Sequence, residues 1–387
     1  MGLMLPSRRL LARGAPWWRR PEHLLDGVAP GLFVDVLNRR HALAGAAVPL
    51  ASVLTVTAAS GKTYWDGAIL RTAAANEARI DWSGGAAELL LEGPATNLCP
   101  VSADFTAAAW VKSGFTASPA TLSNGIGGTA FSGMPNLVLY DQTGATFFTA
   151  EIPRPAPSAL TKRASYTFTT PAGCTAIRFY ALRNGGSAYA YILASVTAST
   201  TYTASWFEEA GVLGGVQIEA GAVATSYIPT TGAAATRATD LCQLTAGAAA
   251  AIQGVSAAVA WRGTIPVALA GQLIVGLGDA AHSIRATNAP TSRIGLFGDT
   301  VATSPGNDVI PGAVGICAGW GTSGSRLGVN GTASTAAETN VWASTIYLGP
   351  STGIATGQTL RLRQLVGWTL TDRPSTAAAI AQARLAA

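Results

Sequence analysis

The sequence predicts an all-β protein with two consecutive antiparallel β-sandwiches of the jelly-roll type, preceded by an extended basic arm and followed by a short C-terminal helix. Short apolar runs alternate with period two, turn residues separate them at regular spacing, and helical periodicity is almost absent. Only 12% of residues are charged, which is typical of packed strands rather than of salt-bridged helices. Because 387 residues exceed one typical core, two compact domains are expected.

Strands in the middle of the chain are predicted at residues 165–170, 176–182 and 188–193, where aromatic and aliphatic side chains alternate with polar ones. Pro-Ala-Gly at 171–173 separates the first strand from the second, and Asn-Gly-Gly at 184–186 separates the second from the third. Glycine and asparagine tolerate the positive φ of tight hairpins. The pattern therefore predicts two hairpins here.

Later strands are predicted from the same alternation, at residues 273–277, 292–297, 314–318, 325–329 and 345–348. Val-Asn-Gly-Thr at 329–332 is the sharpest hairpin signal in the chain. A helix is predicted only at the end, with Thr371 or Asp372 as its cap, Pro374 in its first turn and residues 377–385 as its body.

The N-terminal arm carries most of the net charge. Up to Leu25, five arginines against Glu22 alone leave +4 of the total +5, so the rest of the chain offers no basic groove for nucleic acid. No apolar run is long enough to insert into a membrane. A twin-arginine signal would need an apolar stretch after Ser7–Leu11, and myristoylation would need serine or threonine where Pro6 stands.

Arginine and tryptophan are the residue types that most often anchor interfaces, so the arm is a candidate for attachment to a neighbouring protein. A solvated tail is the open alternative. The candidate anchoring residues are Arg8, Arg9, Arg13, Trp17, Trp18, Arg19 and Arg20.

No metal or cofactor is expected. The cysteines lie far apart without CxxC spacing, and only three histidines are present. Buried free thiols are favoured over disulfides. Ser60–Thr63 lacks the first glycine of a phosphate-binding loop and is interpreted as a turn between strands.

Three passages carry a resemblance. ELLLEGPATNLCPVSADFTAAAW (88–110) resembles the opening of lectin-like modules in bacteriophage fibre and spike proteins, and GVQIEAGAVATSYIPTTGAAATRATD (215–240) resembles the passage that closes such modules. Residues 33–61 are similar to the leader before them, while SRLGVNG and the terminal LVGWTLTDRPSTAAAIAQARLA are similar to the last strands and helix of a concanavalin-like lectin. The resemblance implies an arm over 1–32, leader strands over 33–87, a lectin-like sandwich over 88–236 and a concanavalin-like sandwich over 237–387.

The motif residues also have expected structural roles. We expect Glu92, Thr96 and Asn97 to tie down backbone amides, and Phe105 and Trp110 to fill the core. Arg237 and Asp240 are expected to form a charge-assisted pair between the sandwiches.

The resemblance implies a virion surface appendage, either a head spike or a tail fibre, that binds capsule or other surface polysaccharide of the host. Its other implied partners are virion proteins at the N-terminus and further copies of the same chain. A sugar site needs exposed aromatic faces and polar side chains. The candidate contacts, chosen from their expected loops, are Trp320, Asn307, Asp308 and His282, with a core position as the alternative for Trp320.

Two other functions stay open. A purely architectural virion protein would bind no sugar. A capsule-degrading glycanase would need two facing carboxylates, and the acids of the second half lie far apart in sequence: Asp240, Asp279, Asp299, Asp308, Glu338 and Asp372. A non-enzymatic protein is therefore expected.

Overall fold

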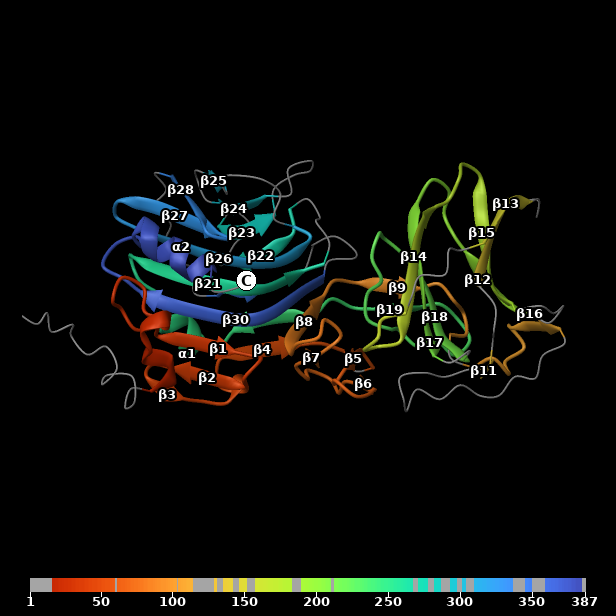
Figure 1. Cartoon of the computed structure of the whole chain (residues 1–387), viewed down its shortest axis with the longest axis horizontal. Helices are drawn as coiled ribbons and strands as arrows, with labels where there is room; N and C mark the ends of the chain where they lie inside the picture. The colour runs from red at the N-terminus through yellow and green to blue at the C-terminus, as the bar shows by residue number, and fades with distance from the viewer. Residues whose placement is uncertain are drawn as a thin grey trace, which may run out of the picture. The chain divides into compact units, whose positions relative to one another are not determined.

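In the computed structural model, most of the regular secondary structure is β-strand, arranged in several antiparallel sheets (Figure 1). The structure describes residues 16–59, 61–102, 104–113, 129–130, 135–141, 146–151, 157–182, 189–209, 212–266, 271–277, 282–286, 293–297, 301–303, 310–336, 345–349 and 359–384. The all-β class expected from the sequence is confirmed.

The chain forms two compact units, and their boundaries differ from the linear division expected above. Unit 1 comprises Met1–Val56, Leu241–Ser351 and Leu360–Ala387, and unit 2 comprises Thr57–Asp240 with Thr352–Thr359. The difference arises because strands far apart in sequence pair: β1 (Leu32–Asp35) lies antiparallel to β30 (Thr359–Thr369). The first part of the expected leader thus belongs to the unit that contains the C-terminus.

Unit 1 contains a large sheet and a second sheet. The large sheet has the order β28-β27-β26-β21-β30-β1-β2-β3, and the second has the order β25-β24-β23-β22-β29-β20-β4. The remaining bounds are β2 Arg40–Leu43, β3 Ala46–Ala47, β4 Leu54–Thr57, β20 Leu241–Leu244, β21 Ala257–Ile265, β22 Leu273–Gly276, β23 Ser283–Ala286, β24 Ile294–Phe297, β25 Val301–Thr303, β26 Gly312–Gly321, β27 Gly324–Val329, β28 Thr332–Ala336 and β29 Tyr347–Leu348. The short helix α1 (Ala246–Ala250) follows β20.

One face of the large sheet is covered by the two ends of the described chain. Ala260, Val366 and Phe33 lie opposite one another on β21, β30 and β1. They share a buried cluster with Trp18 and Leu25 from the N-terminal segment and with Ala379 and Ala383 of helix α2 (Thr376–Arg384). Residues between them on the strands, such as Trp261, face the opposite side.

The N-terminal segment from residue 16 onward is therefore part of the core, which corrects the anchoring role expected for its tryptophans. Trp18 is 9% exposed, and the Trp17 ring makes edge contacts with Trp18 and Phe33 at centroid distances of 5.1 and 5.0 Å. Arg19 and Arg20 are exposed. Arg8, Arg9 and Arg13 lie outside the described residues.

Helix α2 is fixed to the N-terminal segment at both ends. The Ser375 hydroxyl accepts from the amide of Ala378, so Ser375 is the cap rather than Thr371 or Asp372. The backbone N–H and the hydroxyl of Ser375 both donate to the Asp26 carboxylate, at 2.6 and 2.5 Å. At the other end, the Gln382 amide donates to the carbonyls of Glu22 and Leu24, both at 3.1 Å.

Unit 2 contains two sheets with the orders β10-β16-β15-β12-β13 and β11-β18-β17-β14, together with the short pairs β19-β9, β5-β6 and β7-β8. Phe105 and Trp110 lie in its buried cluster, as expected. The bounds are β5 Thr63–Trp65, β6 Leu70–Thr72, β7 Ile80–Asp81, β8 Glu88–Glu92, β9 Ala95–Asn97, β10 Val111–Ser113, β11 Thr129–Ala130, β12 Pro135–Asp141, β13 Thr146–Glu151, β14 Arg163–Thr169, β15 Cys174–Leu182, β16 Tyr189–Ser195, β17 Thr201–Glu209, β18 Val212–Ala220 and β19 Ala235–Arg237.

One hairpin prediction is confirmed and one is wrong. Asn330 and Gly331 have φ values of 44° and 90° and join β27 to β28, as the Asn-Gly signal indicates. The Pro-Ala-Gly turn at 171–173 instead passes from one sheet to the other, because β14 pairs with β17 while β15 pairs with β12 and β16. The turn at 184–186 lies outside the described residues, although β15 and β16 do pair.

A buried ionic cluster occupies unit 2 where the two recognisable motifs meet. Arg79 pairs with Glu92 at 2.7 Å and also with Asp240, while Lys62 pairs with Asp240 and Arg237 pairs with Glu92 at 3.2 Å. The expected Arg237–Asp240 pair is therefore wrong, since each binds another member of the cluster. All these side chains are at most 2% exposed.

The motif residues do tie down backbone, as expected for Glu92 and Asn97. The Asn97 side chain accepts from the amides of Cys99 and Ile218 and donates to the carbonyl of Ile228. Glu92 accepts from the amide of Ser226 at 2.7 Å. Thr96 makes a hydroxyl contact with Thr236 instead.

The buried ionic cluster should make the stability of unit 2 depend on pH in the acid range. Burial alone would raise the pKa of Glu92, but the Arg237 and Arg79 guanidiniums and the Ser226 hydrogen bonds outweigh it and hold that pKa far below the usual 4.5. A depressed pKa stabilises the folded state above pH 4.5 and loses this stabilisation progressively as the pH falls below it. We expect Glu92→Gln to make the fall in unit 2 stability between pH 5 and about pH 2 shallower, measured by urea unfolding at each pH.

The cysteines follow the expectation from the sequence. The four cysteines are buried thiols that form no disulfide, which confirms the thiol prediction. Across the described residues, no group of histidine, cysteine, aspartate and glutamate could hold a metal ion, and no helix has the length and apolarity to span a membrane.

Candidate functional site

The residues expected to contact sugar do not form a site in the structure. Trp320 lies in β26 with its ring fully buried, so it has no exposed face for a ligand and the prediction is corrected. His282 is half-buried before β23. Asn307 and Asp308 lie outside the described residues.

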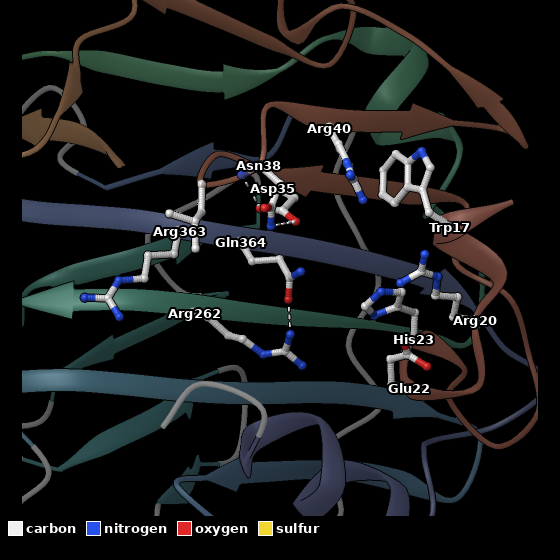
Figure 2. Close-up of a pocket in the computed structure, with 11 residues that line it drawn as sticks. Trp17, Arg20, Glu22, His23, Asp35, Asn38, Arg40, Arg262, Arg363 and Gln364 are labelled. Carbon is white, nitrogen blue, oxygen red and sulfur yellow. Dashed lines mark hydrogen bonds between the residues drawn. The ribbon is translucent and has the colours of Figure 1, made fainter. Parts of the chain in front are cut away.

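A different cavity in unit 1 brings polar side chains together (Figure 2). It has a volume of about 430 Å³, which is within the range of small-molecule pockets. Four parts of the chain line it: the N-terminal segment, the β1–β2 hairpin, β21 and β30. The lining residues are Trp17, Arg20, Glu22, His23, Asp35, Leu37, Asn38, Arg40, Arg262, Arg363 and Gln364.

The floor of this pocket is a row of polar residues across four adjacent strands. Arg262 of β21 lies directly opposite Gln364 of β30. Gln364 in turn lies opposite Asp35 of β1, which lies opposite Arg40 of β2. Directly opposed residues share one face of a sheet, so these four side chains, which we call the polar row, project to the same side.

The polar row lies on the same sheet face as the apolar cluster under the N-terminal segment. On each of these strands, the residue two positions from the polar row lies on the same face of the sheet. These residues are Ala260, Val366, Phe33 and Ala42, and all four are buried. Trp18, Leu25 and helix α2 pack on these apolar residues. The pocket lies where the same face changes from apolar to polar.

Arg262 is the most deeply buried charge of the pocket, with 6% of the residue exposed. Its guanidinium donates to the side-chain oxygen of Gln364 (Figure 2). It also donates to the backbone and side-chain oxygens of Gln382, both at 2.9 Å. Burial lowers the pKa of Arg262 to about 10. Among the described residues no carboxylate forms a salt bridge with it.

Asp35 holds the turn that forms one wall of the pocket. One carboxylate oxygen accepts a hydrogen bond from the backbone N–H of Asn38 at 3.0 Å, and the other accepts from the side-chain amide of Asn38 at 2.8 Å (Figure 2). Arg39, at the end of this turn, has a φ of 52° and is exposed. Its neighbour Arg40 is exposed as well but lines the cavity.

The N-terminal segment supplies the aromatic side of the pocket. Trp17, in the 3-10 turn Trp17–Arg19, is half-buried, and the His23 ring packs on Phe33 at a centroid distance of 4.6 Å. Burial lowers the pKa of His23 below its usual 6.5, so the ring is neutral at pH 7. Trp17 and His23 therefore add ring surface and hydrogen-bonding nitrogens without charge.

Sequence reasoning missed the polar row because its members come from three distant parts of the chain. Each nevertheless leaves a local signal, a charged or amide residue on the apolar face of a strand: Arg262 follows Ala258 and Ala260, Gln364 precedes Val366, and Asp35 follows Phe33. Strand pairing was needed to show that these exceptions align.

Comparisons with known proteins identify no family. No protein family and no curated protein matches the chain. Among solved structures, the binding domain of botulinum neurotoxin serotype C1 shows a TM-score of 0.26 at 7% identity over 62% of this chain and 49% of its own. Trypanosoma rangeli sialidase in complex with sialic acid shows a TM-score of 0.28 at 10% identity over 93% of this chain and 71% of its own. The chain thus spans about half the length of the toxin domain, and at these TM-scores the likeness identifies neither a family nor a function.

Proposed function

We propose that this protein binds carbohydrate through the unit 1 pocket, as a virion surface appendage that attaches to host capsule or other surface polysaccharide. The observation that carries the proposal is the polar row beside the half-buried Trp17. An indole offers a flat apolar surface with a polar N–H, which suits the C–H face of a pyranose. Arginine and amide side chains donate and accept the hydrogen bonds that sugar hydroxyls need.

The virion setting rests on the sequence resemblance of residues 88–110 and 215–240 to phage fibre and spike modules. On this proposal the protein lies on the particle surface as a head spike or tail fibre, forms a homo-oligomer and contacts other virion proteins. With Trp18 buried in unit 1 and with Trp17 and Arg20 lining the pocket, the remaining candidates for attachment to the particle are Arg8, Arg9 and Arg13, together with the exposed Arg19.

A glycanase is the second candidate, because Glu22 and Asp35 both line the pocket. Glycosidases use two carboxylates, one as acid and one as base or nucleophile. Both oxygens of Asp35 accept hydrogen bonds from Asn38, which holds this carboxylate in the turn. Binding without hydrolysis therefore fits the pocket better, and release of reducing sugar from bound polysaccharide would reverse this choice. An architectural protein that binds no sugar remains the third candidate.

The test is binding of the purified full chain to capsulated cells and to matched cells without capsule. We expect selective, saturable binding to capsulated cells, and an affinity about 10-fold lower for Arg40→Ala, because a charged hydrogen-bond donor is lost from the pocket. Arg39→Ala is the matched control, since Arg39 is an exposed neighbour outside the cavity. Equal binding to both cell types, or equal losses in the two variants, would count against the pocket.

A further inference from the structure

The pocket has an excess of positive charge. Arg20, Arg40, Arg262 and Arg363 line it, against the carboxylates of Glu22 and Asp35. Both oxygens of Asp35 accept hydrogen bonds from Asn38, which holds this carboxylate in the β1–β2 turn. A ligand in this pocket meets more guanidinium than carboxylate.

Arg262 makes this excess unusual, because its guanidinium hydrogen-bonds to neutral groups, and Asp35, whose charge acts on it, forms no salt bridge with it. Its donors reach the oxygens of Gln364 and Gln382, and no described carboxylate forms a salt bridge with it. Arg79 and Arg237 of unit 2 differ, since each pairs with Glu92. A buried cation without a counter-ion costs folding free energy, and an anion bound beside it would offset that cost.

Further hydrogen-bond donors lie along the polar row beyond Arg262. Gln364 accepts from Arg262 with its side-chain oxygen, which leaves its amide nitrogen as a donor. Arg40 ends the row on β2, and Figure 2 shows its side chain extending toward Trp17. Guanidinium groups bind carboxylates through two parallel hydrogen bonds, a geometry that neutral hydroxyls do not exploit as strongly.

We propose that the pocket recognises an acidic saccharide, with the sugar carboxylate placed over the polar row between Arg262 and Arg40 and the sugar ring against Trp17. This inference rests on the proposed carbohydrate binding and specifies its ligand class. A neutral polysaccharide would leave the charge of Arg262 without a counter-ion, whereas a uronic or similar sugar acid supplies one.

The experiment uses the full chain and immobilised capsular polysaccharides that contain uronic acids, each in native form and after chemical reduction of its carboxyl groups to alcohols. We expect at least about 10-fold tighter binding to the native forms. Arg40→Ala should lower affinity for native polysaccharide by a larger factor than for the reduced form, because only the native form also loses a guanidinium–carboxylate pair, while Arg39→Ala should match the wild type on both. Raised salt should weaken only the native interaction.

The outcomes separate this inference from the proposed function. Equal affinity for native and reduced polysaccharide, or an equal Arg40→Ala penalty on both, would overturn the acidic-sugar inference and leave carbohydrate binding intact. Preference for dextran sulfate or a phosphate-rich teichoic acid over the native polyuronates would show that the anion is not a carboxylate. Absence of binding to every polysaccharide and to capsulated cells would overturn both.

Discussion

Asp240→Asn is expected to lower the free energy of unfolding of unit 2 by about 3–5 kcal/mol, because it removes one carboxylate from a fully buried ionic cluster. Asp240 accepts from Lys62, from Arg79 and from the amide of Glu92. An amide in its place leaves Lys62 without its carboxylate and Arg79 with Glu92 alone, in surroundings from which water is excluded. Breaking such a pair costs more than the pair itself contributes, since the remaining charge stays buried.

The measurement is hydrogen exchange of the β17 and β18 amides in increasing denaturant, which reports on unit 2 within the full chain. Asp66→Asn is the control, because Asp66 also pairs with an arginine, Arg71, whose side chain is 53% exposed. That exposed pair should contribute less than about 1 kcal/mol. Equal protection in the two variants would mean that the buried cluster contributes no more than a surface pair.

The sequence anticipates features of this molecule that depend on neighbouring residues. The Asn-Gly turn at 330–331 needs positive φ at two consecutive positions, and that requirement is local. The Pro-Ala-Gly turn at 171–173 is equally visible, but whether it joins partners or sends the chain to another sheet depends on β17, which follows about thirty residues later. Local turn chemistry thus locates strand ends without fixing which strands pair.

Nearness in sequence likewise does not determine which charged residues form ion pairs. Arg237 and Asp240 are near neighbours in sequence, so a pair between them is the natural expectation, yet Arg237 binds Glu92 and Asp240 binds Lys62. Trp320 stands between two glycines that resemble a loop, but the long strand β26 carries it into the core. The pocket was beyond sequence analysis for a related reason, since its floor exists only when β21, β30, β1 and β2 are adjacent.

The second large effect is expected from removing the N-terminal segment. Deletion of residues 1–31 takes away Trp18 and Leu25 and uncovers the apolar face around Phe33 and Trp368. Truncating one buried tryptophan to alanine costs about 3–5 kcal/mol, and truncating one buried leucine costs about 2–5 kcal/mol. Because whole domains are stable by only about 5–15 kcal/mol, we expect the deleted chain to lose the cooperative unfolding transition of unit 1.

Hydrogen bonds add to this expected loss. The Trp368 indole donates to the carbonyl of His23 at 3.2 Å, and Gln382 donates to the carbonyls of Glu22 and Leu24. Asp26 holds the capping Ser375 of α2. Their loss leaves buried donors without partners, so α2 should loosen together with the sheet. Calorimetry and exchange in β30 and α2 provide the measurement.

The control is deletion of residues 1–15, which removes Arg8, Arg9 and Arg13 and keeps the packed segment from residue 16 onward. We expect this shorter chain to retain the unit 1 transition and its polysaccharide binding, so a loss of incorporation into particles would report on attachment alone. Deletion of every residue up to Leu25 would not separate attachment to the particle from the stability of unit 1, since it removes core residues and a wall of the pocket together with the arginines. If the 1–31 deletion unfolded like the full chain, the N-terminal segment would not be part of the core, and both the pocket and the acidic-sugar inference built on it would fail.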